Sequence, residues 1–301
     1  MFANITFVSN RFPNSKIFLI EEGLDTSNLI LPNLTIIKQH KDLSPRHRDF
    51  LKNYFHLWGR QRGLSSDENR ELILIQLERY FYIYESLVNH GIENFVNLDS
   101  DCVILGDLST HNFEKIGITY APFSEDCVAS PLMSSTANLD KFLDFTCSFY
   151  EEMQQQKDKI KYIDSFFNKP RKQVTDMTIW HLFKEENPNL FVNNLSLDSY
   201  DSIHDLGLGT GNWDYSCSAL NSLNNGNYHF TTQTAQKHNP QGTLETAHIK
   251  QIFYTEDGPC FEEKGTKKLI KIKSLHFSPG TLKFDIIPFI EEYEKIYGSP
   301  H

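Results

Sequence analysis

The sequence lacks three features that would each assign it to a broad class of protein. No apolar run reaches the length needed to cross a membrane, so we expect no transmembrane segment. The five cysteines form no Cys-x-x-Cys pair and no even framework, which predicts free thiols in a reducing, cytoplasmic setting without a signal peptide. Basic residues are the minority: 29 Lys and Arg against 39 Asp and Glu give a net charge of −10, which argues against nucleic acid as the main partner.

What the chain does have is length. Its 301 residues suffice for one large α/β domain with a real core. Aromatic residues are abundant, with 23 Phe and 13 Tyr, which favours an aromatic-rich core over a sugar-stacking surface.

A pair of carboxylates lies between two short apolar runs near the middle of the chain. Residues 95–98 precede Asp99 and Asp101, and residues 103–105 follow them. Short runs of large apolar and β-branched residues are typical of buried strands. The carboxylates would then stand at the carboxyl end of a strand, where ligands collect in open α/β sheets. Two hard oxygen ligands at such a place suit Mg²⁺ or Mn²⁺.

The N-terminal residues predict a helix in place of the first strand of a nucleotide-binding fold. Apolar residues recur at helical spacing over residues 2–12, and residues 16–20 read as a strand. The turn at 13–15 is too short for the crossover that joins parallel strands, so the alternative to a helix over residues 2–12 is an antiparallel hairpin with the strand at 16–20. Glu21 and Glu22 at the end of the strand are candidates for hydrogen bonds to a base or ribose, with a solvated turn as the alternative.

Residues 67–90 give the longest helical pattern, and Gly91 ends it. Arg79 lies on or beside the apolar face of this helix. Most such arginines extend their stems along the core, but Arg79 could instead reach a sugar hydroxyl or a phosphate. Later in the chain, Thr175 or Asp176 could cap a helix. Further helices are expected over residues 45–62, 139–153 and 286–297.

Three polar residues in the last third of the chain extend the candidate site. His276 follows an apolar strand, and Lys283 lies beyond a Pro-Gly turn. An imidazole can complete a Mn²⁺ site begun by carboxylates, and a Lys can neutralise a departing diphosphate. A core histidine is the alternative for His276. Asp214 belongs to an Asn-Trp-Asp-Tyr cluster suited to a sugar.

These stretches resemble known motifs when they are taken in order. Arg79-Tyr80 followed by Asn97-Leu-Asp-Ser-Asp-Cys-Val-Ile resembles the Arg-aromatic helix and Asp-x-Asp strand of GT-A nucleotide-sugar glycosyltransferases. Asp176 in Thr-Asp-Met-Thr and then Leu-His-Phe-x-x-Gly-x-Leu-Lys follow in an order that is similar to the glycogenin and lipopolysaccharide galactosyltransferase family, and to a set of bacterial and viral sugar transferases. The likeness spans most of the chain.

The resemblance implies a fold and a reaction. The fold would be α/β: a Rossmann-like GT-A domain spanning residues 1–301, with a mixed, mostly parallel central sheet flanked by helices. Residues 1–120 would bind the nucleotide sugar, and residues 121–301 would bind the acceptor. The activity would be metal-dependent transfer of a sugar from a UDP- or GDP-sugar to a glycan or glycoconjugate acceptor, in polysaccharide biosynthesis.

The resemblance also assigns roles to individual residues. Asp101, Asp99 and His276 would bind Mn²⁺ or Mg²⁺, with Asp99 on the metal or the ribose. Asp176 would lie near the reacting sugar, as a base or as a group that positions the acceptor, and Asp214 is a second candidate for that role. The residues expected to contact the donor are Glu21 or Glu22, Arg79, Asp99, Ser100 and Lys283.

Two alternatives stay open. Asp99-Ser-Asp-Cys-Val also matches the Asp-x-Asp-x-Val motif of haloacid-dehalogenase-like phosphohydrolases, in which the first Asp is a nucleophile. That motif normally opens the chain, and a later Asp pair is expected to follow a Gly-Asp; the sequence shows neither feature. The other alternative is a non-catalytic glycan-binding relative, which the absence of a first strand would suit.

Overall fold

The protein is a mixed α/β structure. The computed structural model describes residues 2–21, 23–38, 43–54, 66–106, 108, 111–120, 127–155, 174–192, 202–204, 230–238, 244–277 and 286–298. Its helices are α1 (Phe2–Arg11), α2 (Pro45–Asn53), α3 (Ser66–Asn89), α4 (Thr136–Gln155), α6 (Asp176–Glu186) and α8 (Ile286–Tyr297), with a short 3₁₀ helix at Pro188–Leu190. No helix in the described ranges is both long and apolar enough to cross a bilayer.

The strands form several small sheets rather than one large one. They are β1 (Ile17–Glu21), β2 (Leu34–Lys38), β3 (Asn94–Asn97), β4 (Cys102–Ile104), β5 (Gly117–Tyr120), β6 (Cys127–Ser135), β7 (Ser202–His204), β8 (Thr232–His238), β9 (Leu244–Lys250), β10 (Ile252–Thr255), β11 (Gly258–Glu262) and β12 (Leu269–His276). β3, β6 and β5 form one sheet, β10, β11, β12, β4 and β7 form another, and β1–β2 and β8–β9 are separate pairs.

The expected mostly parallel central sheet is not found in the described residues. Among the named strands described there, β1 with β2 and β7 with β12 pair in parallel and the other pairs are antiparallel, and Ile116 and Phe191 form an isolated parallel bridge. The cause is chain connectivity, because parallel neighbours need a crossover of a dozen or more residues. β10, β11 and β12 instead follow one another through short turns.

The helix boundaries follow from capping. Ser44 accepts a hydrogen bond from the His47 amide at the start of α2. Thr175 is the N-cap of α6 and forms a capping box with Thr178, so of the two expected caps it is Thr175 that is observed. After α3, Gly91 adopts a φ of +62°, a left-handed conformation that ends a helix at little cost only when the residue is glycine.

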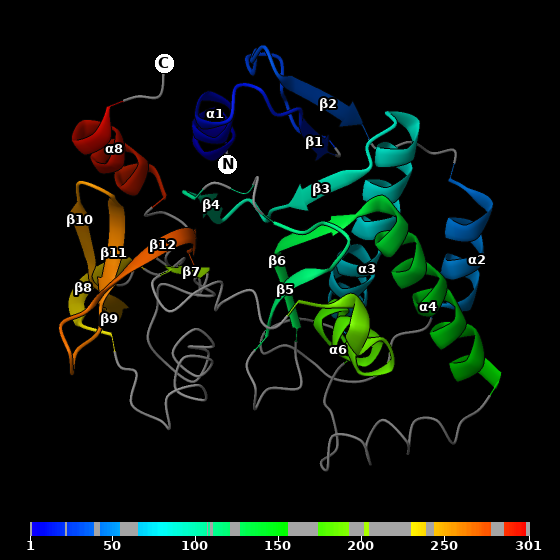
Figure 1. Cartoon of the computed structure of the whole chain (residues 1–301). Coiled ribbons are helices and arrows are strands. Elements are labelled where there is room, and N and C mark those ends of the chain that lie inside the picture. Colours follow the sequence, from blue (N-terminus) through cyan, green and yellow to red (C-terminus); the bar gives the residue numbers. More distant parts are fainter. Residues whose placement is uncertain are drawn as a thin grey trace.

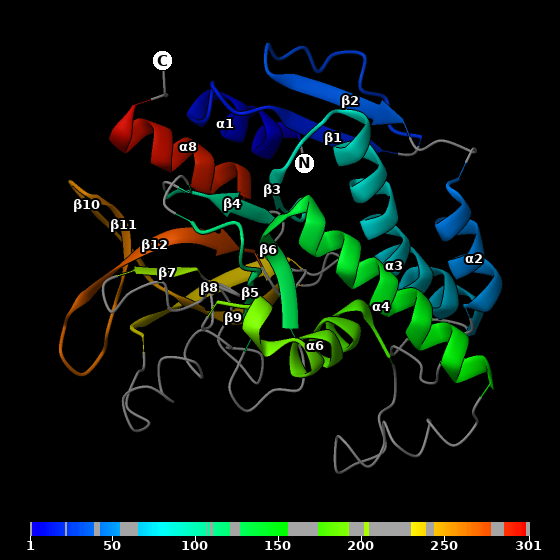
Figure 2. The same cartoon turned by 45° about the vertical axis from the view of Figure 1, so that its right-hand side comes forward.

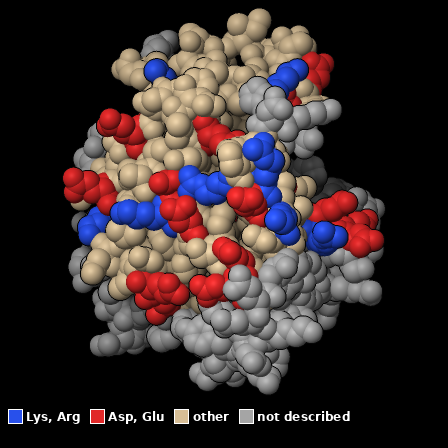
Figure 3. Space-filling model, turned by 90° about the vertical axis from the view of Figure 1, so that its right-hand side faces the viewer, with Lys and Arg blue, Asp and Glu red and all other residues tan. Residues whose placement is uncertain are grey.

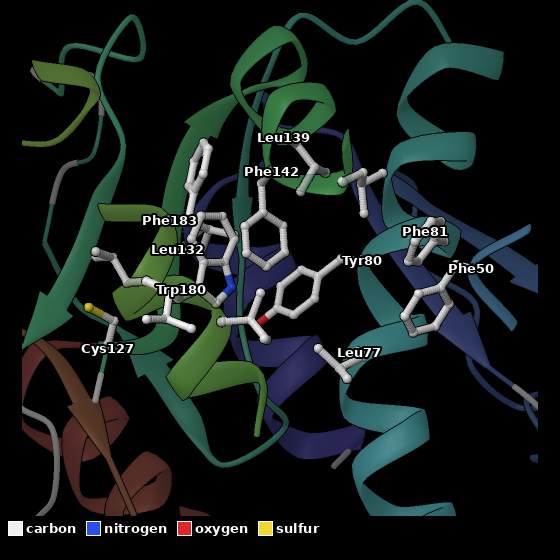
Figure 4. Close-up of a cluster of buried hydrophobic side chains, with 14 of the residues drawn as sticks. Phe50, Leu77, Tyr80, Phe81, Cys127, Leu132, Leu139, Phe142, Trp180 and Phe183 are labelled. Carbon is white, nitrogen blue, oxygen red and sulfur yellow. The ribbon is translucent and has the colours of Figure 1, made fainter. Parts of the chain in front are cut away.

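Two hydrophobic clusters hold the elements together, and Figures 1 and 2 show how those elements are arranged. The first, here the Tyr80 cluster, packs α3, α4 and α6 against β5 and β6, with Trp180 stacked on Phe142 at a centroid distance of 3.6 Å (Figure 4). The second, here the Phe261 cluster, packs α1 and α8 against β4, β11 and β12. Each cluster contains residues from before and after position 120, where the donor-binding part of the chain was expected to end. Members of the Phe261 cluster include Phe7, Val103, Phe261, Leu275, Phe289 and Tyr293.

The surface carrying α2 and α4 shows acidic and basic side chains intermingled (Figure 3). Arg46 of α2 contributes to this pattern by pairing with Asp140 and Asp144 of α4, at 2.5 and 2.9 Å. The described part of this face therefore offers no single-sign patch of the kind that attracts nucleic acid.

Candidate metal centre

The connection between β3 and β4 carries the Asp-x-Asp triplet, and β12 brings a histidine beside it. β12 pairs antiparallel with β4 so that His276 lies opposite Cys102 and Leu275 lies opposite Val103. The amide of Phe277 then donates a hydrogen bond of 2.8 Å to the carbonyl of Asp101. The strand ladder therefore places the His276 side chain next to the loop that carries the two aspartates.

Three potential ligands converge at this point. One ligand atom from each of Asp99, Asp101 and His276 lies within 4.8 Å of the other two. Nε2 of His276 lies 3.3 Å from Oδ1 of Asp101. The side chains of Asp101 and His276 are only 8% and 12% exposed, whereas that of Asp99 is 32% exposed. The candidate centre is therefore shielded from solvent at Asp101 and His276 and accessible to solvent at Asp99.

The donor set fits a divalent cation. Ligand atoms lie about 2.0–2.2 Å from Mg²⁺ or a similar ion, so two ligands of one ion are separated by up to ~4.3 Å. The 4.8 Å limit for these three atoms requires only small side-chain adjustments. Two carboxylates suit Mg²⁺ or Mn²⁺, and the imidazole is a ligand that Mn²⁺ accepts more readily than Mg²⁺. Metal binding itself stays a prediction.

Arg79 of α3 joins the loop at residues 98–101, which carries two of the candidate ligands and is here called the metal loop, to α6. Its Nη1 donates to Oδ1 of Asp99 at 2.8 Å, and its Nη2 donates to Oδ2 of Asp176 at 2.7 Å. Nη2 also lies 2.8 Å from the hydroxyl oxygen of Tyr80, which in turn donates to Asp176 at 3.1 Å. One guanidinium therefore fixes a residue of the metal loop relative to the first residue of α6.

Burial and charge act against each other in this network. Burial alone lowers the pKa of Arg79, but Tyr80, Asp176 and Asp99 act the other way and hold that pKa well above its ordinary value. Burial raises the pKa of Asp176 above 3.8, although Arg79 opposes the shift. Burial also raises the pKa of Tyr80, so its hydroxyl keeps its proton and can donate. Arg79 is accordingly a permanent cation between two carboxylates.

Two residues that the sequence did not indicate support the metal loop. Asn4 of α1 donates from Nδ2 to the carbonyls of Ser100 and Cys102, at 3.1 and 2.9 Å. Ser130 of β6 accepts a hydrogen bond of 2.9 Å from the Asp99 amide. Neither residue stands out in a sequence, because a polar residue in a helix or strand is ordinarily solvent-facing.

The remaining predicted site residues are placed differently. Glu21 ends β1, is 3% exposed and accepts a hydrogen bond of 2.8 Å from the Leu24 amide, so its carboxylate stabilises the turn. Ser100 is exposed between the two aspartates. Glu22, Asp214 and Lys283 lie outside the described residues. Contacts of Glu21 or Glu22 with a nucleoside, and of Lys283 with a diphosphate, stay predictions.

Comparison of this chain with protein-family models, with curated protein sequences and with solved structures gives no match in any of the three. The class of protein is therefore argued from the fold and from the geometry of the candidate metal centre.

Proposed function

We propose that this chain is a metal-dependent glycosyltransferase of GT-A type. It moves a sugar from a nucleoside-diphosphate donor to a glycan, lipid-linked or protein acceptor, with Mn²⁺ or Mg²⁺ as cofactor. The observation that carries this proposal is the convergence of Asp99, Asp101 and His276 within 4.8 Å of one another. The mixed α/β arrangement and the order of the motifs along the chain support it.

The proposed roles follow from exposure and charge. Asp101 and His276, whose side chains are 8% and 12% exposed, would hold the cation, and the more exposed Asp99 would be accessible to the donor. A bound divalent cation neutralises charge on the departing diphosphate. Lys283 would supply further positive charge there. Arg79 keeps Asp99 in place, and its side chain, which is 30% exposed, would also contact the donor sugar.

Asp176 is better suited to positioning than to proton abstraction. Its Oδ2 accepts hydrogen bonds from Arg79 and Tyr80, and the Met177 amide also bonds to the carboxylate. A general base needs an oxygen within reach of the acceptor hydroxyl. These contacts support a role for Asp176 in shaping the wall of the sugar site, while Asp214 stays the second candidate for the reacting group.

The test combines ligand binding with turnover. UDP, GDP and CDP and their sugars are screened by thermal shift with and without Mn²⁺, and sugar transfer or slow donor hydrolysis is then measured with the nucleotide that binds. A ligand present at 100 times its Kd stabilises the folded state by about 2.7 kcal/mol, which such a screen detects. We expect stabilisation that requires both nucleotide and Mn²⁺.

Asp101→Asn should abolish the metal-dependent part of both signals. Asp144→Asn on α4 is the matched control, because its side chain is 70% exposed and it pairs with Arg46 on the surface that carries α2 and α4. Full Mn²⁺-dependent transfer by Asp101→Asn would refute the proposal. Release of phosphate from simple monoesters, without nucleotide binding, would favour the phosphohydrolase instead.

A further inference from the structure

Helix α1 lies along β4 and presents two side chains to its backbone. Asn4 donates to the carbonyls of Ser100 and Cys102, and Arg11 donates to the carbonyl of Leu105. Residues 4 and 11 are about two helical turns apart and so share one face of the helix. Both views of the fold place α1 beside α8 and over β4 (Figures 1 and 2).

This contact lies along the edge of β4 that pairs with no described strand. In the described part of the chain β4 pairs with β12 and with no other strand. An edge strand presents backbone carbonyls that need donors when they are buried. Side chains of α1 supply donors to Cys102 of β4 and to Ser100 and Leu105 on either side of it, in place of a neighbouring strand.

The position of Asn4 is specific for an amide donor. The residue is 5% exposed, and asparagine is among the weaker helix formers, so helix propensity does not explain its presence. Its two carbonyl partners stand on either side of Asp101. Rotating the amide by half a turn would set its oxygen against two carbonyl oxygens, so the observed orientation is the one that the surroundings require.

We propose that Asn4 is a positioning residue for the metal centre, which it serves by fixing the backbone on both sides of Asp101. This inference rests on the proposed function. The Asp101 carbonyl is held by the Phe277 amide from β12, and the flanking carbonyls are held by Asn4 from α1. The Asp101 side chain is thereby directed at His276. Partners that orient metal ligands ordinarily account for 10- to 100-fold in metal affinity.

The experiment measures Mn²⁺ binding by calorimetry, with metal alone and below the melting temperature of each variant. Asn4→Leu keeps the side-chain volume but removes the donor, and Asn4→Ala is the second variant if the first does not fold. We expect the Mn²⁺ Kd to rise about tenfold.

Two matched controls separate positioning from general stability. Asn138 on α4 is 4% exposed and donates to the Glu114 carbonyl at 3.0 Å, in the Tyr80 cluster half of the molecule. Arg11 lies on α1 itself but bonds to the far end of β4 and to the Tyr293 hydroxyl. Asn138→Leu and Arg11→Met should lower the Tm and leave the Mn²⁺ Kd unchanged.

The outcomes are distinguishable. An unchanged Mn²⁺ Kd in both Asn4 variants, with normal binding by the wild type, would overturn this inference alone. A Mn²⁺ Kd that rises in all variants in proportion to their loss of Tm would also overturn this inference, since the role of Asn4 would then be only structural. Absence of Mn²⁺ binding by the wild type would overturn the metal centre and this inference together.

Discussion

Replacing Arg79 with Met removes the cation that joins Asp99 to Asp176. Methionine keeps an unbranched stem and a similar helix propensity, so α3 itself should be little affected. The variant leaves the Asp176 carboxylate, only 6% exposed, without its charged partner. Asp99, whose side chain is 32% exposed, regains contact with water more easily.

The expected loss can be estimated from these exposures. Removing one partner of a buried ion pair destabilises a protein by about 3–5 kcal/mol, because the remaining charge is uncompensated. Arg79 is itself 30% exposed, so solvent screens part of the interaction and the lower end of that range applies. The pair with Asp99 adds at most about 1 kcal/mol. We therefore expect Arg79→Met to lower the free energy of unfolding by about 3 kcal/mol at pH 7.

The loss should shrink at lower pH. Burial already raises the pKa of Asp176 above 3.8, and removing Arg79 takes away the group that opposes that shift. Between pH 3.8 and the folded-state pKa of Asp176, the folded protein binds a proton on Asp176 that the unfolded chain does not. The stability of Arg79→Met therefore falls as pH rises through this interval and recovers as pH is lowered.

Urea unfolding of four proteins provides the assay: wild type, Arg79→Met, Asp176→Asn and the double variant, each at pH 7 and pH 5. The double variant carries no uncompensated charge at position 176, so the double-mutant cycle should give a coupling of about 2 kcal/mol at pH 7. Strictly additive losses, or a loss below about 1 kcal/mol for Arg79→Met at pH 7, would refute the argument from burial.

Three further expectations can be checked by the same unfolding measurements. Phe142→Ala should destabilise by about 3–5 kcal/mol, since Phe142 is fully buried and stacked on Trp180. Arg46→Met should cost at most about 1 kcal/mol. Burial raises the pKa of Asp140, but hydrogen bonds from Arg46 and Tyr84 outweigh burial and lower that pKa below 3.8. The stability contributed by the Arg46–Asp140 pair is therefore present above pH 3.8 and is lost as the pH falls through the folded-state pKa of Asp140. Gly91→Ala should cost about 1 kcal/mol through its φ of +62°, with no steric clash within 4 Å; no effect would contradict the strain argument.

Helices and regularly patterned strands were predictable from the sequence. The patterns over residues 67–90, 139–153 and 286–297 correspond to α3, α4 and α8, because each buries one apolar face. Residues 16–20 correspond to β1, and the helix expected over residues 2–12 is α1. The buried side chains of α1 are Asn4, Phe7 and Ser9, however, and Phe2 is 40% exposed, so the apolar spacing marked the buried face only in part.

Other elements carried no usable pattern. β6 contains Pro131 and several serines, and a proline ordinarily argues against a strand. β8 is a run of polar residues, Thr-Gln-Thr-Ala-Gln-Lys-His, whose pairing with β9 is set by backbone hydrogen bonds. The alternating apolar pattern of a strand arises when one of its faces is buried, so a hairpin of polar residues does not show it.

The candidate site was partly predictable. Asp99 and Asp101 stand out because charged residues between apolar runs need a reason. Their proximity to His276 depends on the β4–β12 ladder, which local sequence does not encode, and only the order of the motifs suggested it. The link from Arg79 to Asp176 and the support from Asn4 arise from tertiary packing alone.

The three candidate ligands are held from both hydrophobic clusters. Asp99 is bonded to Ser130 of β6 and Arg79 of α3, on the side of the Tyr80 cluster. Asp101 and His276 lie at the β4–β12 pair, whose Val103 and Leu275 belong to the Phe261 cluster. A cation bound by all three residues would therefore link the elements of the Tyr80 cluster to those of the Phe261 cluster. Metal binding would then slow the separation of the two clusters, and backbone amides in both would gain protection from hydrogen exchange together.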